Sequence, residues 1–130
     1  MSETHVLDAS AILVLLLGEP GAERLTRLLD AGGCLVSAVN CAEVATKLDD
    51  AGMPEREVAA LLSSLRLAVV DFDAAQALHC GLLRGRTRAQ GLSLGDRACL
   101  QLALTRQAVA VTADRAWSKA RTGARVEVLR

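Results

Sequence analysis

Aromatic side chains are almost missing from this sequence of 130 residues. They make up 2% of it, with one Phe, one Trp and no Tyr. Modules that bind single-stranded nucleic acid usually stack bases on aromatic rings, so this scarcity argues against the common RNA-recognition folds. Leu, Val and Ala must then build the core, and a hydrophobic content of 52% is enough for one domain over residues 1–130.

Paired cysteines and long apolar runs are missing as well. Cys34, Cys41, Cys80 and Cys99 form no C-x-x-C pair, and no His stands at zinc-finger spacing. We interpret the four thiols as small buried side chains in a reducing cytoplasm. The apolar run at residues 9–17 is too short to span a bilayer and follows acidic residues, so we expect neither a membrane segment nor a signal peptide.

Charge is balanced overall but unevenly spread. Residues 1–83 carry 5 basic and 12 acidic side chains, whereas residues 84–130 carry 10 basic and 3 acidic ones. The basic part has two interpretations, a solvated Arg-rich helical surface or a contact with a polyanion.

Short apolar runs alternate with amphipathic segments along the chain. The runs that predict strands cover residues 4–8, 34–37, 67–72, 108–112 and 126–129. The segments that predict helices cover residues 10–21, 22–33, 42–53, 54–65, 74–88, 93–106 and 114–120. We therefore expect an α/β fold of three layers, α/β/α, whose central, mostly parallel sheet has four to five short strands flanked by helices.

Four acids stand where these strands end or where helices begin. Asp8 and Asp114 follow strands directly, while Glu43 and Asp96 lie in the first turns of their helices. Right-handed crossovers bring the strand-to-helix turns of a parallel sheet to one edge, where ligands bind. The four carboxylates are thus candidates for a common site.

Local hydrogen bonding also explains each acid without any ligand. Asp8 and Asp114 can cap the helices that follow them, and Asn40 with Glu43 has the spacing of a capping box. Glu43 could also pair with Lys47, one helical turn later.

The fourth acid, Asp96, is the sharpest case. Ser93 with Asp96 repeats the spacing of a capping box. Asp96 also heads an apolar stripe of its helix that should face the sheet. The acid should therefore point inward, where a cap alone gains nothing from partial burial.

Carboxylates that meet at one edge repel one another, by about 4 kcal/mol per pair at an effective dielectric near 20. Protonation, a basic partner or a metal ion must offset this repulsion. An all-oxygen donor set selects Mg²⁺ or Mn²⁺. The chemistry that such a site favours is metal-assisted hydrolysis of a phosphate ester.

The stretches VLDASAIL, SAVNCAEV, LSLGDRACLQLA and VTADRAW occur in the order and at the spacing typical of a PIN domain. From Asp8 to Trp117 the sequence resembles the VapC-type toxins of bacterial toxin–antitoxin pairs. The resemblance implies a single PIN domain over residues 1–130 that acts as a Mg²⁺-dependent endoribonuclease, with Mn²⁺ as a substitute. It also implies an RNA substrate, a cognate antitoxin whose C-terminal segment lies in the active-site groove, a homodimer and a cytoplasmic location.

Roles for individual residues follow from the same resemblance. The family's four catalytic and metal-binding acids correspond to Asp8, Glu43, Asp96 and Asp114. By analogy Asp8 and Asp96 are the main metal ligands, while the other two ligate, directly or through water, or take the proton from the attacking water. Ser10 and Thr112 match the small hydroxyl positions that support these carboxylates.

Basic residues near these positions are candidates for RNA contacts. They are Arg84, Arg86, Arg88, Arg97 and Arg115. Phosphate binding and a solvated helix end explain the first three equally well. His5 and His79 have no partner at useful spacing and are interpreted as bystanders, and Trp117 as a core residue.

Three other functions compete with the ribonuclease. A metal-dependent phosphatase with Asp8 as nucleophile would want a second acid two residues later, where Ser10 stands. A phospho-accepting receiver domain would want a lysine at a late strand end, and neither Lys47 nor Lys119 is placed there. A catalytically weak PIN domain that only binds RNA or protein is disfavoured by the four intact acids.

Overall fold

A five-stranded sheet forms the centre of the computed structural model, which describes residues 3–129. Its strands are β1 (His5–Leu7), β2 (Cys34–Ser37), β3 (Ala68–Val70), β4 (Val109–Thr112) and β5 (Arg125–Val128). They lie in the order β3-β2-β1-β4-β5, and neighbouring strands are parallel throughout. The prediction of an α/β fold with a mostly parallel sheet is confirmed.

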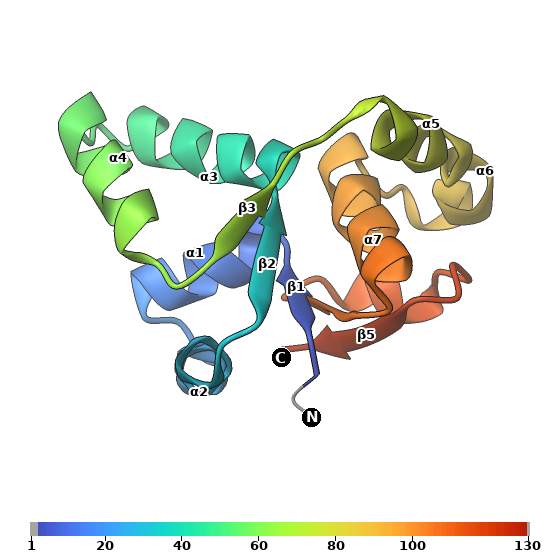
Figure 1. Cartoon of the computed structure of the whole chain (residues 1–130), viewed down its shortest axis with the longest axis horizontal. Helices are drawn as coiled ribbons and strands as arrows, with labels where there is room; N and C mark the ends of the chain where they lie inside the picture. Colours follow the sequence, from blue (N-terminus) through green and yellow to red (C-terminus); the bar gives the residue numbers. More distant parts are fainter. Residues whose placement is uncertain (1–2, 130) are drawn as a thin grey trace.

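Helices connect the strands and cover both faces of the sheet. They are α1 (Ala9–Leu17), α2 (Ala22–Ala31), α3 (Ala38–Asp50), α4 (Glu55–Ser64), α5 (Ala74–Leu82), α6 (Arg84–Thr87) and α7 (Leu94–Arg106), with short 3-10 helices η1 (Arg88–Gln90) and η2 (Arg115–Lys119). Figure 1 shows α1 to α4 on one side of the sheet and α5 to α7 on the other. In residues 3–129 no helix is long and apolar enough to cross a membrane.

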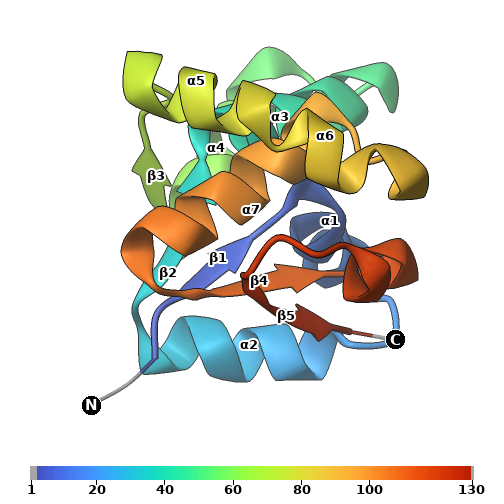
Figure 2. The ribbon, with the colours of Figure 1, turned by 90° about the vertical axis from the view of Figure 1, so that its right-hand side faces the viewer.

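Each face of the sheet packs against its own hydrophobic core. The fold therefore has the predicted three layers, α/β/α. Leu7 and Val111 pack with α1 and α2 in one core. Their neighbours Val6 and Ala110 pack with α7 in the other, and Figure 2 shows α7 lying across the strands. Because side chains alternate between faces along a strand, a parallel sheet covered on both sides needs such continuous apolar runs.

The prediction of one continuous helix over residues 74–88 is wrong. The chain breaks after Leu82 into α5, α6 and η1. Here Leu83 is buried, and the hydroxyl of Thr87 donates to the Leu83 carbonyl at 2.9 Å. Burial of these two side chains turns the chain back toward α7, which a straight helix would not allow.

Helix α3 also begins earlier than predicted, at residue 38 rather than 42. The cap is Ser37, whose hydroxyl accepts from the Val39 amide at 3.2 Å. Asn40 therefore lies inside the helix, and the predicted capping box of Asn40 with Glu43 is wrong. The shift matters for function because it frees the Asn40 side chain for other contacts.

Turns at the carboxyl ends of the strands place the acids. Asp8 ends β1 and caps α1, accepting from the Ala11 amide at 2.8 Å. Asp114 follows β4 and caps η2, accepting from the Ala116 amide at 2.9 Å. Because β1 and β4 are parallel neighbours, both turns lie at the same edge of the sheet. Both capping predictions are confirmed.

Candidate active site

The four acids line one cavity of about 230 Å³ at that edge. They come from four separate parts of the chain: Asp8 after β1, Glu43 from α3, Asp96 from the first turn of α7, and Asp114 after β4. The remaining wall consists of Ala9, Ser10, Leu13 and Lys47. The structure thus brings together every acid that the sequence singled out.

Exposure increases from the floor of this cavity to its rim. Asp8 is 3% exposed and forms the floor. Glu43 and Asp96 are half-buried, and Asp114 is exposed. A ligand that enters from solvent would therefore meet Asp114 first and Asp8 last.

Asp8 is fixed by hydrogen bonds to both of its carboxylate oxygens. The Ser10 hydroxyl lies 2.8 Å from Oδ1 and 3.0 Å from Oδ2, and the Thr112 hydroxyl donates to Oδ2 at 2.6 Å. The Ala11 amide donates to Oδ1. The nucleophile of a phosphatase must reach the phosphorus atom of its substrate, and Asp8, which is 3% exposed, is poorly placed for that role.

The two hydroxyls also join the ends of β1 and β4. Thr112 Oγ1 accepts from the Asp114 amide at 3.0 Å, and Ser10 Oγ accepts from the Ala113 amide at 3.0 Å. The hydroxyl oxygens themselves lie 3.3 Å apart. This small network sets the position of Asp8 relative to the backbone of Asp114.

Burial raises the pKa of Asp8 from 3.8 to about 6. The hydrogen bonds from Thr112, Ala11 and Ser10 lower it, and the nearby charge of Asp96 raises it further. At neutral pH the protein therefore holds a buried negative charge that burial disfavours. A cation bound beside Asp8 would relieve this unfavourable state.

Glu43 is positioned by two elements rather than one. The Asn40 side-chain amide donates to Glu43 Oε1 at 2.8 Å and to the Gly95 carbonyl of α7 at 3.0 Å. Sequence spacing related Asn40 to Glu43 but gave it the wrong role, as a cap. The sequence did not indicate a role for Gly95 beside Asp96, because the neighbouring residues do not predict that the Glu43 side chain packs against it.

Asp96 has the predicted capping box. The Ser93 hydroxyl accepts from the Asp96 amide at 3.2 Å, and Asp96 Oδ2 accepts from the Ser93 amide at 2.9 Å. Cys99 and Leu100, which follow one turn later, are fully buried. The cap fixes one carboxylate oxygen of Asp96 at the head of this apolar stripe.

The donor set fits a hard divalent cation. Carboxylates and hydroxyls provide oxygen donors only, and the cavity wall has no thiolate or imidazole among the described residues. Within residues 3–129, no three His, Cys, Asp or Glu side chains are already arranged to hold a metal ion together. Mg²⁺ does not need such a cage, because it commonly binds one or two carboxylates together with waters and substrate phosphate.

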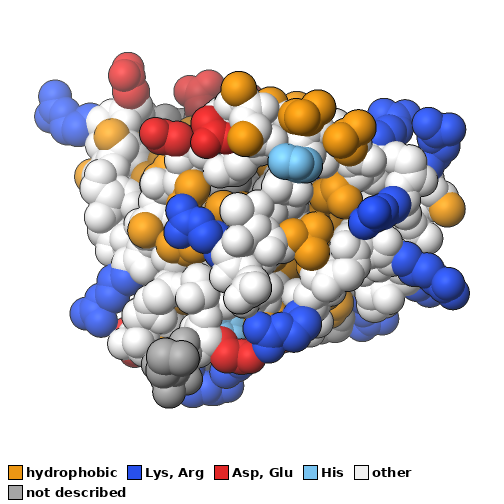
Figure 3. Space-filling model, turned by 45° about the vertical axis from the view of Figure 1, so that its right-hand side comes forward, with side chains coloured by type: hydrophobic (Ala, Val, Ile, Leu, Met, Phe, Trp, Pro, Cys, Tyr) orange, Lys and Arg blue, Asp and Glu red, His pale blue; other side chains and the backbone are white. Residues whose placement is uncertain are grey.

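The arginines do not line the acidic cavity. Arg84, Arg86 and Arg88 are exposed on α6 and η1, and Figure 3 shows Lys and Arg side chains gathered toward that end of the molecule. Arg115 is exposed directly after Asp114. Arg97 is buried beneath α5 and donates to the Cys80 carbonyl at 3.1 Å. Arg97 is therefore not available for the RNA contact that the sequence suggested.

Lys47 is a basic residue that sequence reasoning did not include among the candidate RNA contacts. It is exposed and, within the described part of the chain, is the one basic side chain on the cavity wall. The sequence allowed an ion pair of Lys47 with Glu43, but residues 3–129 contain none between these two side chains. Its charge is available to a ligand that enters the cavity.

The remaining predictions concern the core. Cys34, Cys80 and Cys99 are buried as expected, whereas Cys41 is only half-buried. Burial raises the pKa of the Cys99 thiol well above its usual range, so no thiolate forms behind the carboxylates. Trp117 is 1% exposed in the core under α7, as predicted.

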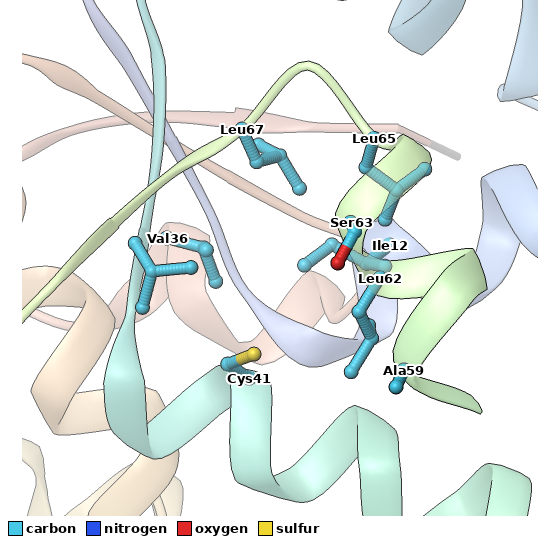
Figure 4. A pocket seen from close by; sticks show the side chains of 9 residues that line it. Ile12, Val36, Cys41, Ala59, Leu62, Ser63, Leu65 and Leu67 are labelled. Atoms are coloured by element: carbon cyan, nitrogen blue, oxygen red, sulfur yellow. The ribbon is translucent and has the colours of Figure 1, made fainter. Parts of the chain in front are cut away.

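A second cavity, of about 380 Å³, is apolar and separate from the acids. It lies between α3, α4 and the β2–β3 side of the sheet, with Val36, Leu62 and Leu67 pointing into it (Figure 4). Among its described wall residues there is no carboxylate. It is therefore not a candidate for hydrolytic chemistry.

Known proteins resemble this chain in sequence and in fold. The family model of the PIN domain matches residues 5–122. The tRNA(fMet)-specific endonuclease VapC of Shigella flexneri is 30% identical over 91 residues, which is 69% of each chain.

Solved structures resemble the fold over nearly its whole length. DNA-bound VapBC from Salmonella typhimurium has a TM-score of 0.76 at 22% identity, covering 99% of this chain and 100% of that one. VapBC2 from Rickettsia felis, bound to a promoter fragment, has a TM-score of 0.77 at 17% identity, covering 98% and 99%. These structures show that the fold is shared, and the match of the family model with the Shigella relative shows that the chain belongs to the PIN domain family.

Proposed function

We propose that this protein is a metal-dependent endoribonuclease toxin that hydrolyses RNA phosphodiester bonds and is neutralised by a cognate antitoxin. The observation that carries the proposal is the convergence of four carboxylates from four parts of the chain on one cavity. A chain that needed only helix caps would have no reason to bring them together, because their mutual repulsion destabilises the fold. The Shigella relative, an endonuclease specific for a tRNA, supports RNA as the substrate class.

The proposed roles follow from depth and hydrogen bonding. Asp8 and Asp96 would hold Mg²⁺ or Mn²⁺, since each already has one oxygen fixed by a backbone amide. A divalent ion bound there would lower the pKa of the attacking water and neutralise the negative charge that develops on the phosphate. Glu43 and Asp114, nearer the opening, would accept the proton of the attacking water or complete the ligand set. Ser10 and Thr112 would hold Asp8 in place.

Basic residues around the cavity would bind the RNA backbone. Lys47 on the wall is suited to a phosphate close to the scissile bond, and Arg84, Arg86 and Arg88 to more distant ones. Phosphate contacts of this kind make affinity depend strongly on salt.

An antitoxin and a second copy of the chain are the proposed protein partners. The Salmonella and Rickettsia structures are VapBC complexes, which supports an antitoxin partner for this chain. A toxin–antitoxin pair that acts on cellular RNA also implies a cytoplasmic location. Size-exclusion chromatography with light scattering on the toxin alone and with its antitoxin tests both assemblies.

The activity is tested with purified protein, freed of any antitoxin, and total cellular RNA. Cleavage should require Mg²⁺ or Mn²⁺, stop with EDTA, and be lost in Asp96→Asn, whose amide oxygen can still accept from the Ser93 amide. The matched control is Asp73→Asn, which changes an acid that caps α5 outside the cavity. Equal cleavage by wild type and Asp96→Asn would show that the activity is a contaminant or that the site is elsewhere.

Metal binding has a separate readout. Mg²⁺ or Mn²⁺ should raise the melting temperature of wild type and of Asp73→Asn, because a ligand that binds only the folded state stabilises it. The rise should disappear in Asp96→Asn. A large rise that survives in this variant would place the metal at another site.

A further inference from the structure

The Glu43 carboxylate lies against the first turn of α7, at the one position where that turn has no side chain. A Cβ atom added to Gly95 would lie less than 3.0 Å from both carboxylate oxygens of Glu43. The glycine is not needed for backbone conformation, because it lies inside α7 and is not among the positive-φ residues. Glycine disfavours a helix, so the space it leaves for Glu43 is the physical reason for its presence.

Asn40 ties the same carboxylate to the same turn. Its side chain is 1% exposed, and its amide group donates both to Glu43 Oε1 and to the Gly95 carbonyl. These two hydrogen bonds connect α3 to α7 across 55 residues of sequence. Both hydrogen bonds are made by Nδ2, whereas Oδ1 of the same side chain is buried without a hydrogen-bond partner in the described part of the chain. Burying a polar oxygen in this way is unfavourable, so the contacts of Nδ2 with Glu43 and Gly95 account for the place of this side chain.

We infer that Asn40 and Gly95 are positioning residues that hold the Glu43 carboxylate in the cavity beside Asp96. Gly95 provides the space, and Asn40 provides the hydrogen bond that selects one rotamer of a flexible side chain. Neither residue is among the described residues that line the cavity. The inference rests on the proposed ribonuclease function, in which Glu43 handles the proton of the attacking water or completes the ligand set.

A purely structural role makes a different prediction. If Asn40 and Gly95 only pack α3 against α7, their substitution should lower stability and leave the chemistry of the folded protein unchanged. Gly95→Ala separates the two roles, because alanine favours the helix while its methyl group displaces the end of a flexible Glu side chain. The variant should therefore fold with an undiminished melting temperature and cleave slowly.

The first test is single-turnover cleavage of RNA by Gly95→Ala and Asn40→Ala at saturating Mg²⁺. We expect the rate constant to fall by about 10- to 100-fold, since small misplacements of catalytic groups have effects of this size. The protein concentration that gives half the maximal rate constant should change by less than about twofold. Gly81→Ala is the matched control, because Gly81 lies in α5 with nothing within 4 Å of an added Cβ. In a Glu43→Gln background, neither substitution should reduce the rate further.

The second test needs no activity. The ¹³C carboxyl resonance of Glu43, assigned by its loss in Glu43→Gln, should move in Gly95→Ala and Asn40→Ala of the metal-free protein and stay in place in Gly81→Ala. Unchanged resonance and rate in Gly95→Ala, while Glu43→Gln is inactive, would overturn the positioning roles and leave the ribonuclease proposal intact. Full activity of Glu43→Gln would also overturn the positioning roles, because the carboxylate that Asn40 and Gly95 hold would then have no part in catalysis. A wild-type protein that cuts no RNA would instead refute the proposed function.

Discussion

Replacing Asp8 with asparagine should stabilise the metal-free protein at neutral pH while abolishing its activity. The new side chain would keep the cap of α1, because asparagine is as good an N-cap as aspartate and its Oδ1 can accept from the Ala11 amide. Its side-chain amide would face the hydroxyls of Ser10 and Thr112, which can rotate to accept. The substitution thus removes the buried charge and little else.

The size of the effect follows from the pKa of Asp8. Burial raises this pKa from 3.8 to about 6 in the folded protein. Each pKa unit is worth about 1.4 kcal/mol, so the ionised form of Asp8 destabilises the fold by up to about 3 kcal/mol at pH 7.5. A neutral asparagine avoids this loss, and the expected rise in melting temperature is roughly 10 °C.

The pH dependence has a definite sign. Between pH 4 and pH 6 the folded protein holds a proton on Asp8 that the unfolded chain has released, so this group's contribution to stability falls as pH rises. The advantage of Asp8→Asn should therefore shrink from about 3 kcal/mol at pH 7.5 to about 1 kcal/mol at pH 4.5. Other acids titrate in the same range, so only the difference between variant and wild type is informative.

Urea unfolding in EDTA at pH 4.5 and pH 7.5 measures this difference. Asp73→Asn, the same substitution at an exposed cap, should change the free energy of unfolding by less than about 0.5 kcal/mol at either pH. An Asp8→Asn protein that is no more stable than wild type at pH 7.5 would refute the claim that the fold keeps Asp8 in an unfavourable state.

Three further predictions concern neighbouring residues. Thr112→Val should cost about 1–2 kcal/mol of stability and raise the pKa of Asp8 further, moving the acid limb of the pH–rate profile to higher pH. Lys47→Gln should weaken RNA binding and reduce its log–log salt slope by about one, whereas Lys119→Gln, outside the cavity, should leave the slope unchanged; equal slopes in both would remove Lys47 from the interface. Trp117→Ala should lower the free energy of unfolding by about 3–5 kcal/mol in urea titration, because it empties part of the core under α7.

Much of the site was predictable because it follows from strand ends. Apolar runs fix where β1 and β4 stop, and parallel pairing then forces Asp8 and Asp114 to the same edge. The capping box of Ser93 with Asp96 is a local pattern whose partners are three residues apart, and it forms as predicted. Such features need no knowledge of what packs against them.

The failures share a cause, which is dependence on distant parts of the chain. Arg97 follows Asp96 in sequence, but one step along a helix turns the side chain by about 100°, and here it turns toward α5. The sequence predicts a local capping role for Asn40. Its neighbours in the sequence do not indicate that its side chain donates to the Gly95 carbonyl, 55 residues later. The break after α5 likewise depends on which side chains the α7 core can bury.

The hydrogen bond from Thr112 to Asp8 joins residues that are 104 positions apart. During synthesis, a nascent chain that ends before β4 has Asp8 at the end of β1 but no Thr112 to hold it and no Asp114 at the rim. Contacts of such long sequence separation also form late in folding, because the intervening chain must first be ordered. A cell that makes the proposed nuclease therefore has a built-in delay between the start of translation and the first competent active site.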